Sequence, residues 1–441
     1  MRRPVRAYRA NGALIPLAGS LFGTMVATSG LGFVFWWMAA RLFPPRSLGI
    51  AGAAVSAMML LSSVGLMGMG SVLIRDLPRH RGREPSLILS GLLVAGGVSA
   101  GLAVLFALIS PLISPDLGVL AAGPAPILLF AFGTAITAVG VVLDRALIGM
   151  LMAPAQLIRN TIMSIAKLAI LPAATLFAFS GLEIFAAWTV GMVLSMVALA
   201  AWGLVRMGRR LLAAPDWSIL GGLTGAAWWH HVLNLTLQAP TWVMPLVVTA
   251  VASAETNAAF YVALLLVSFI WYVPGVFEVS LFAVGSQSRG IVPRDLRLSL
   301  GVSTAAALLS IAGTVLLGER VLAFFHPAFA AQAASALVIM SIGSLPLVVK
   351  NHYVAIHRVH FQERSAALVS ILTVILEAGL ATAGLVAGGL TGLAIGWLVA
   401  MTVEAVAMSP AVIREFNHPG NLLSRGTPSP GSGIPAAADQ Q

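Results

Sequence analysis

The sequence predicts an all-α integral membrane protein of about twelve transmembrane helices, arranged as two six-helix lobes related by a parallel pseudo-two-fold repeat. Three observations lead to this fold class. The 441-residue chain is 59% hydrophobic and only 9% charged, a composition that a water-soluble fold cannot bury. Its arginines concentrate on one side of the expected spans, so that arginine-rich and arginine-poor connections alternate along the chain. Its two halves also share sequence features at a nearly constant offset.

Twelve stretches are long enough to cross a bilayer, because about 20 mainly apolar residues span roughly 30 Å of hydrocarbon. All the connections between them are short, so any function must lie between the helices. The expected spans cover residues 12–40, 47–73, 87–113, 121–148, 155–179, 183–205, 220–250, 257–285, 298–317, 332–356, 366–387 and 391–413.

The arginines predict the orientation of these spans. With the N-terminus assigned to the cytoplasm, 20 arginines fall on the cytoplasmic side and three on the other side, the bias that is typical of membrane proteins. The protein is therefore expected in the plasma (inner) membrane, with both termini on the cytoplasmic side. The net charge of +10 reflects this sidedness rather than nucleic-acid binding, and the basic edge is expected to contact anionic lipids.

The two halves of the chain predict the repeat. Trp188 near the end of the first half matches Trp397 in the second, and Gly65 matches Gly275. Two sets of six spans with the same orientation imply an axis along the membrane normal, a common transporter plan. The expected organisation is a basic N-terminus (1–11), an N-lobe (12–208), a cytoplasmic linker (209–219), a C-lobe (220–415) and a disordered cytoplasmic tail (416–441).

Two segments resemble a known family. FWWMAARLFPPRSLGIAGAAVSAMMLLSSVGLMGMGSVLIRDL (35–77) is similar to the first two spans of the polysaccharide flippase branch of the multidrug/oligosaccharidyl-lipid/polysaccharide (MOP) exporter superfamily. DRALIGMLMAPAQLIRNTIMSIAKLAILP (144–172) resembles the family's linker between spans four and five. The resemblance implies two lobes around a central cavity, alternating access and a lipid-linked oligosaccharide as cargo. Val64 stands where the family often has an acidic residue, so a role for that acid does not carry over.

The only two lysines lie inside apolar spans, where a charge is costly and marks a candidate site. Each shares a helical face with other polar side chains, at the spacing of three or four residues that places them on one side. Polar stripes of this kind either bond to a neighbouring helix or line a wet cavity. The predicted cavity residues are Lys167 and Ser164 on span five, Lys350 and Tyr353 on span ten, and His231, Asn234, Gln238 and Trp242 on span seven.

Three acidic residues also lie within spans and are candidates for ion coupling or charge pairing: Glu278, Glu377 and Glu404. Glu278 follows Pro274 and Gly275, which predict a kink or break in span eight. Glu377 is a possible partner of Lys167. Near the cytoplasmic edge, Asp144 is expected to pair with the adjacent Arg145. Trp36, near a span end, is expected at the membrane interface, and Arg358 in the cytoplasmic connection between spans ten and eleven.

The leading interpretation is a secondary transporter that flips a polyprenyl-(di)phosphate-linked glycan, with H+ or Na+ as a possible coupling ion. Its buried lysines would meet the phosphate charge. The alternative is a multidrug/cation antiporter of the same architecture, which the three acidic residues keep open. No enzyme is expected, since a glycan polymerase or ligase would need a sizeable outer loop. Neither a cofactor nor a metal is predicted: the chain has no cysteine, and neither lysine follows a glycine as in an ATP-binding Walker A loop.

Overall fold

In the computed structural model of the protein, the described residues are 30–80, 82–150, 152–177, 180–207, 214–223, 225–288 and 291–417. Within these ranges the chain is helical and forms no strand. The elements are a helix at Gly30–Leu42, α2 (Pro45–Gly65), α3 (Met69–Asp76), α4 (Glu84–Ile113), η1 (Pro115–Ala121), α5 (Pro124–Gly149), α6 (Ala153–Ala174), α7 (Leu182–Met207), η3 (Trp217–Leu223), α8 (Ala226–Val251), α9 (Ala254–Ser288), α10 (Pro293–Phe325), α11 (Pro327–Ile342), α12 (Ser344–Val359) and α13 (Glu363–Asn417).

The described helices follow the predicted spans in order. Nine are long and apolar enough to cross a bilayer, and α11 with α12 makes a tenth span, bent by 41°. Helix α13 is counted once, although it contains two helices that meet at the non-helical Gly388 and Gly389. The helix Gly30–Leu42 is the described part of the first span. The all-helical membrane fold is therefore confirmed. The N-terminal segment 1–11 and the tail from 418 onwards lie outside the described residues.

Three spans differ in detail from the prediction. The second is broken between α2 and α3, because Met67 and Gly68 adopt left-handed backbone angles (φ 46° and 86°). The tenth is bent at Gly343, between α11 and α12. Conversely, the break considered at Pro274 is absent, since α9 continues as one helix through this residue. A membrane helix tolerates proline where neighbouring groups satisfy the freed carbonyl.

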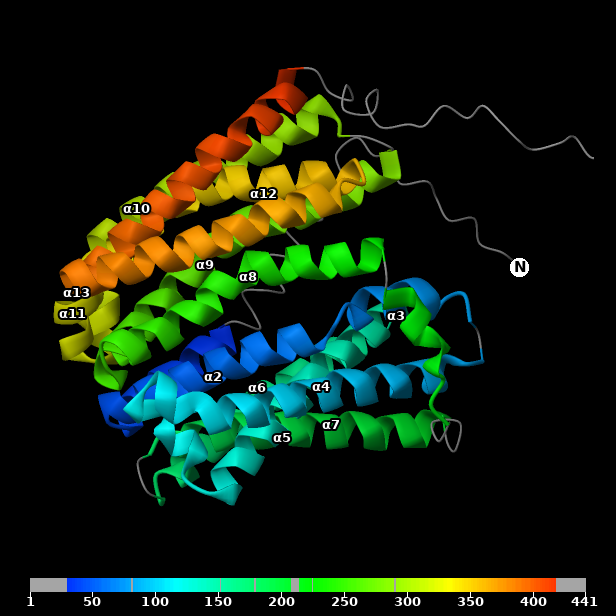
Figure 1. The fold of residues 1–441 in the computed structure, drawn as a ribbon, viewed down its shortest axis with the longest axis horizontal. Helices are drawn as coiled ribbons and strands as arrows, with labels where there is room; N and C mark the ends of the chain where they lie inside the picture. The colour runs from blue at the N-terminus through cyan, green and yellow to red at the C-terminus, as the bar shows by residue number, and fades with distance from the viewer. Residues whose placement is uncertain are drawn as a thin grey trace, which may run out of the picture.

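The helices form two lobes, α2–α7 in the lower part of Figure 1 and α8–α13 in the upper part. At one end the lobes are joined by polar contacts. Asp116 of η1 accepts hydrogen bonds from Arg46 (2.7 Å) and from the backbone N–H of Ala254 (2.8 Å). Asn257 donates to the carbonyl oxygen of Gly49 (2.8 Å). This end holds the connections predicted to face outside, and the lobes diverge toward the opposite end in Figure 1.

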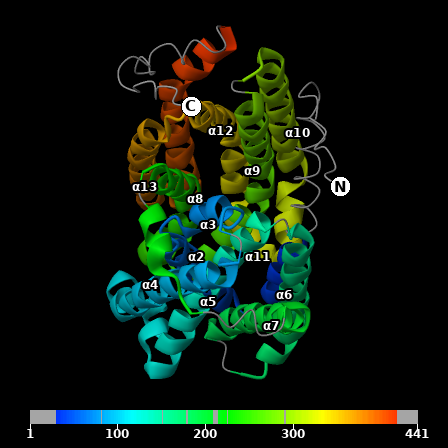
Figure 2. The same cartoon turned by 90° about the vertical axis from the view of Figure 1, so that its right-hand side faces the viewer.

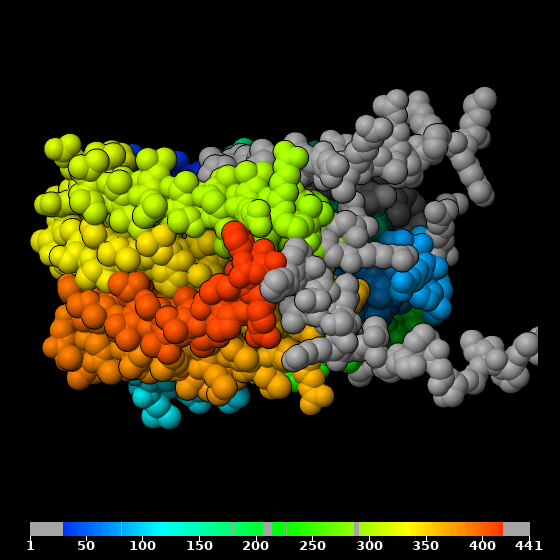
Figure 3. Space-filling model, turned by 90° about the horizontal axis from the view of Figure 1, so that it is seen from above, coloured from blue at the N-terminus to red at the C-terminus, as the bar shows by residue number. Residues whose placement is uncertain are grey.

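The arrangement of buried side chains agrees with this divergence. One apolar core spans both lobes and includes Phe35 and Phe185 from the first with Phe260 and Trp397 from the second. Of the two smaller cores, one lies mainly in the N-lobe and also includes Ala227 of α8, and the other is confined to the C-lobe. Figure 2 shows α9, α10 and α13 above α4, α5 and α7, and Figure 3 shows α10, α11 and α13 side by side on one face of the C-lobe.

The described part of the linker is fixed to the N-lobe. The backbone N–H of Asp216 donates to the hydroxyl of Ser90 in α4 (2.7 Å), and its carboxylate binds Arg83. Hydrogen bonds from Ser218, together with Arg83, hold the pKa of Asp216 below its usual value. The chain therefore leaves the N-lobe from a fixed point before it enters α8.

Candidate functional site

A cavity of about 820 Å³ lies between the lobes, within the size range of ligand-binding pockets. Its N-lobe wall comes from the helix Gly30–Leu42 and from α2, α3, α5, α6 and α7. Its C-lobe wall comes from α8, α9, α12 and α13. The cavity is therefore lined by more helices than the three that carry the predicted polar stripes.

Most of the predicted residues lie in this cavity wall: Lys167, Lys350, His231, Asn234, Gln238, Trp242, Glu278 and Glu377. Three do not. Ser164 is buried in α6. Tyr353 belongs to the C-lobe core, where its ring packs at a tilt against that of His357, with a centroid distance of 3.9 Å. Glu404 lies behind the wall and bonds to Lys350. The structure thus brings together residues of spans five, seven, eight, ten and eleven.

Lys167 is held by aromatic rings. Its side chain extends from α6, and Nζ lies 3.7 Å from the ring centroid of Trp188 and 4.9 Å from that of Phe35. Within the described chain no carboxylate oxygen lies within 4 Å of this ammonium. Aromatic faces attract a cation without neutralising its charge. The pairing with Glu377 that the sequence left open is not formed, because Glu377 binds Lys350.

The aromatic residues beside Lys167 connect the lobes. Trp36, expected from its position near a span end to lie at the membrane interface, is only 2% exposed. Its ring lies 4.6 Å from that of Tyr261 in α9 and 6.2 Å from that of Trp188. The interfacial assignment of Trp36 is therefore wrong. Proximity to a span end does not reveal a residue that faces the other lobe.

Arg145 is a second cation in the N-lobe wall. The predicted pair between Asp144 and Arg145 is wrong. The Asp144 carboxylate is instead bound by the buried Arg159, with N–O distances of 2.9 and 2.6 Å. Adjacent residues on a helix point about 100° apart, so Asp144 faces α6 while Arg145 reaches the cavity.

In the C-lobe wall, one lysine sits between two carboxylates. Nζ of Lys350 donates to Glu377 at 2.6 Å and to Glu404 at 2.9 Å. The indole N–H of Trp397 completes the shell of Glu377 at 2.7 Å. The positive charge of Lys350 is thereby compensated within the protein.

The remaining acidic residue in the wall, Glu278, is paired with Arg358 at 2.7 Å. The same guanidinium donates to Asn234 at 2.6 Å. Arg358 was expected in a cytoplasmic connection, but it lies buried in the last turn of α12. Arg358 follows Lys350 by eight residues, close to two helical turns. This spacing was the signal in the sequence that could have placed Arg358 on the same helical face as Lys350.

The two walls consequently differ in charge. The described N-lobe lining contains Lys167 and Arg145 and no carboxylate, whereas each carboxylate of the C-lobe lining is within 3 Å of a cation. Two further donors, the indole N–H groups of Trp188 and Trp271, are buried in the wall and have no acceptor among the described residues. The arrangement suits a ligand rich in acceptor oxygens. Among the described residues, no group of histidine and acidic side chains is placed to hold a metal ion.

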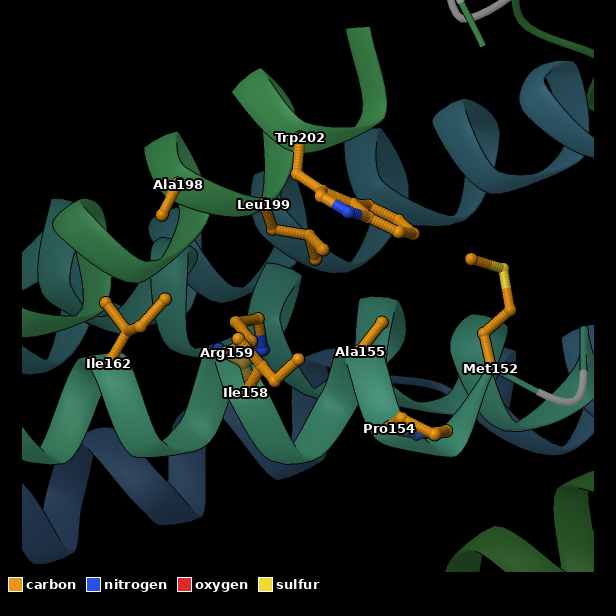
Figure 4. Close-up of a pocket in the computed structure, with 9 residues that line it drawn as sticks. All are labelled: Met152, Pro154, Ala155, Ile158, Arg159, Ile162, Ala198, Leu199 and Trp202. Atoms are coloured by element: carbon orange, nitrogen blue, oxygen red, sulfur yellow. The ribbon is translucent and has the colours of Figure 1, made fainter. Parts of the chain in front are cut away.

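A second pocket, of about 500 Å³, lies between α6 and α7 (Figure 4). Apart from Arg159, already bound to Asp144, its lining is apolar: Met152, Pro154, Ala155, Ile158, Ile162, Ala198, Leu199 and Trp202. None of the predicted site residues lies in it.

Comparison with known proteins gives relatives of the fold. The chain matches no protein-family profile and no curated protein sequence. Among solved structures, it is similar to an inward-facing multidrug resistance MATE family transporter of the MOP superfamily, with TM-score 0.67, 15% identity, and coverage of 91% of this chain and 96% of that one. An outward-facing conformation of such a transporter matches with TM-score 0.64, 15% identity, and coverage of 95% and 97%.

A third similar structure is a MOP superfamily transporter from Pyrococcus furiosus, described as having a binding pocket of reverse polarity that suggests a different function. It matches with TM-score 0.60 and 14% identity, over 92% of this chain and 96% of that one. The chain therefore has the fold of the MATE transporters of the MOP superfamily, over nine-tenths of its length.

Proposed function

We propose that the protein is a secondary transporter that moves a lipid-linked oligosaccharide or polysaccharide precursor across the plasma membrane by alternating access. The cargo would be a polyprenyl-(di)phosphate-linked glycan. The observation that carries this proposal is the charge of the N-lobe wall, where Lys167 and Arg145 face the cavity with no carboxylate in the described lining.

The phosphate of such a cargo would lie beside Lys167. A phosphate oxygen can accept a charge-assisted hydrogen bond from the ammonium and a second bond from the indole N–H of Trp188, which has no acceptor in the described part of the chain. Gln238 and Asn234, which are exposed in the same cavity, are suited to sugar hydroxyls. Transport against a gradient would need a coupling ion such as H+ or Na+, and the basic cytoplasmic edge would face anionic lipids.

The alternative is a multidrug/cation antiporter, the role named for the similar MATE structures. Cationic cargo needs carboxylates whose charge is available. Here Glu278 is bound by Arg358, and Glu377 is bound by Lys350. The Pyrococcus furiosus protein supports the anionic interpretation by analogy, since its own binding pocket is described as having a reverse polarity that suggests a different function.

Substitution of Lys167 tests the proposal. Lys167→Ala is expected to reduce export of the lipid-linked glycan at least tenfold per folded molecule, because a hydrogen bond to a charged group contributes about 1.5–3 kcal/mol. Lys167→Glu should abolish export, whereas Lys167→Arg should retain part of it because the charge survives. Export is measured in a deletion strain and normalised to the folded protein in its membranes.

Thr161→Ala is the matched control, since Thr161 lies on the same helix, outside the cavity lining, and its hydroxyl donates to the carbonyl oxygen of Leu157. It should export normally. Full export by Lys167→Ala would contradict the proposed cargo site.

A further inference from the structure

Lys350, Glu377 and Glu404 form a buried cluster of one amino group and two carboxyl groups. One ammonium lies between two carboxylates, and the three side chains are at most 5% exposed. Glu377 is fully bonded, by Lys350 and by Trp397. Glu404, in contrast, has one oxygen, Oε1, that is buried and has no hydrogen-bond donor in the described structure. The cluster therefore offers more acceptor capacity for a cation than the lysine uses.

The ammonium of Lys350 lies where a cation from the cavity would bind. Lys350, Glu377 and Trp397 all belong to the cavity wall. The ring of Trp271, also in the wall, packs edge-on against Trp397 at a centroid distance of 5.2 Å. Two carboxylates beside indole rings are the groups that recognise an organic ammonium ion.

Lys167 provides an internal comparison. It is equally buried, at 4% exposure, and also lines the cavity. Its partners are the rings of Trp188 and Phe35, with no carboxylate within 4 Å in the described chain. Removing its ammonium would leave an aromatic pocket with no negative charge. Removing that of Lys350 would leave two carboxylates facing an amine-sized space.

We infer that Lys350 is a built-in occupant of a cation-binding site: its ammonium fills the position at which Glu377 and Glu404 would otherwise bind an organic cation from the cavity. Lys350 then prevents the C-lobe wall from binding cationic cargo. Its ammonium occupies the site formed by the two carboxyl groups, in addition to repelling the positive charge of the cargo. This exclusion rests on the proposed function for its biological meaning, but the site itself does not depend on the identity of the cargo.

The test is rescue by a free amine. The full-length protein and Lys350→Ala are purified in detergent with and without n-butylammonium chloride, and thermal unfolding and amine binding are measured at constant ionic strength with NaCl as the matched salt. Lys350→Ala is expected to bind the amine at least tenfold more tightly than the unmodified protein, about 1.4 kcal/mol. Its melting temperature should rise with amine concentration until the site saturates.

Two variants serve as controls. Lys350→Ala/Glu377→Gln/Glu404→Gln keeps the space but removes the charge, and Lys167→Ala removes the other buried lysine. Neither should respond to the amine more than the unmodified protein does. A response of equal size in either control would overturn the inference, as would its absence in Lys350→Ala.

Because Lys350→Ala leaves two uncompensated carboxylates, its folded yield without amine is expected to fall. Recovery of that yield when n-butylammonium is present throughout purification is a supporting result. Lys350→Ala/Glu404→Gln, with one carboxylate, is the second variant and should bind the amine more tightly than the triple variant. If neither variant is recovered or stabilised by the amine, the inference fails. These measurements involve no glycan lipid. The amine test and the Lys167 export test can therefore fail independently of each other.

Discussion

Gly49→Ala is expected to prevent the lobes from closing at the end where they meet in this structure. A Cβ atom at Gly49 would lie 1.7 Å from the carbonyl oxygen of Ala254 and 2.6 Å from its carbon. Both are backbone atoms at the start of α9, so no side-chain rotation can relieve the overlap. Separation of α2 from α9 would relieve it, at the cost of the bond from Asn257 to the Gly49 carbonyl. The protein should therefore populate a state that is open at this end.

Cysteine labelling measures this opening, since the chain contains no cysteine of its own. Ser268→Cys places a single thiol in the cavity wall. A membrane-impermeant maleimide, added from the side that this end faces, should react at least tenfold faster in the Gly49→Ala background. Gly97→Ala is the control, because a Cβ there meets nothing within 4 Å. Equal rates in all three backgrounds would show that Gly49 does not govern the closure.

Arg358→Ala is expected to cause the largest loss of stability. It would leave Glu278 in a buried site without its cation and would remove the donor to Asn234. Breaking a buried ion pair from one side costs about 3–5 kcal/mol, which is a large share of the stability of a typical protein. Adding Glu278→Gln should restore much of the folded yield, because the remaining partner is then uncharged.

The folded yield after detergent extraction, measured by size-exclusion chromatography, follows this effect. Arg364→Ala is the matched control: its side chain is exposed and lies 5.6 Å from the ring of Trp229. It should keep nearly the full yield. Unchanged yield for Arg358→Ala would contradict the structural role of the pair, and a double variant no better than the single one would show that charge is not the cause.

The fold could be predicted from the sequence because crossing a bilayer imposes a length and an apolar composition on each span. Those constraints act locally, so they also placed Lys167 and Lys350 inside spans. The partners of these lysines could not be derived in the same way. Hydropathy measures the cost of a side chain in hydrocarbon, whereas the contact between Lys350 and Glu404 depends on how α12 and α13 pack.

Arg358 shows the same limit. It was assigned to a polar connection, yet inside the lobe Glu278 compensates its charge and Asn234 accepts a hydrogen bond from it. The prediction for Trp36 was wrong for a related reason, since an aromatic ring near a span end suits both the membrane interface and a contact between lobes. The stripe on α8 could be recognised because His231, Asn234 and Gln238 repeat at helical spacing along the face of α8 that lines the cavity.

The central claim is that the cavity binds an anionic group through Lys167. Its most direct test is the affinity of the purified protein for a short-chain polyprenyl diphosphate, compared by titration with the uncharged polyprenol of the same length. The diphosphate should bind at least tenfold more tightly, and Lys167→Ala should remove most of that difference. Equal affinities for the two lipids, or a difference that Lys167→Ala leaves intact, would contradict the account.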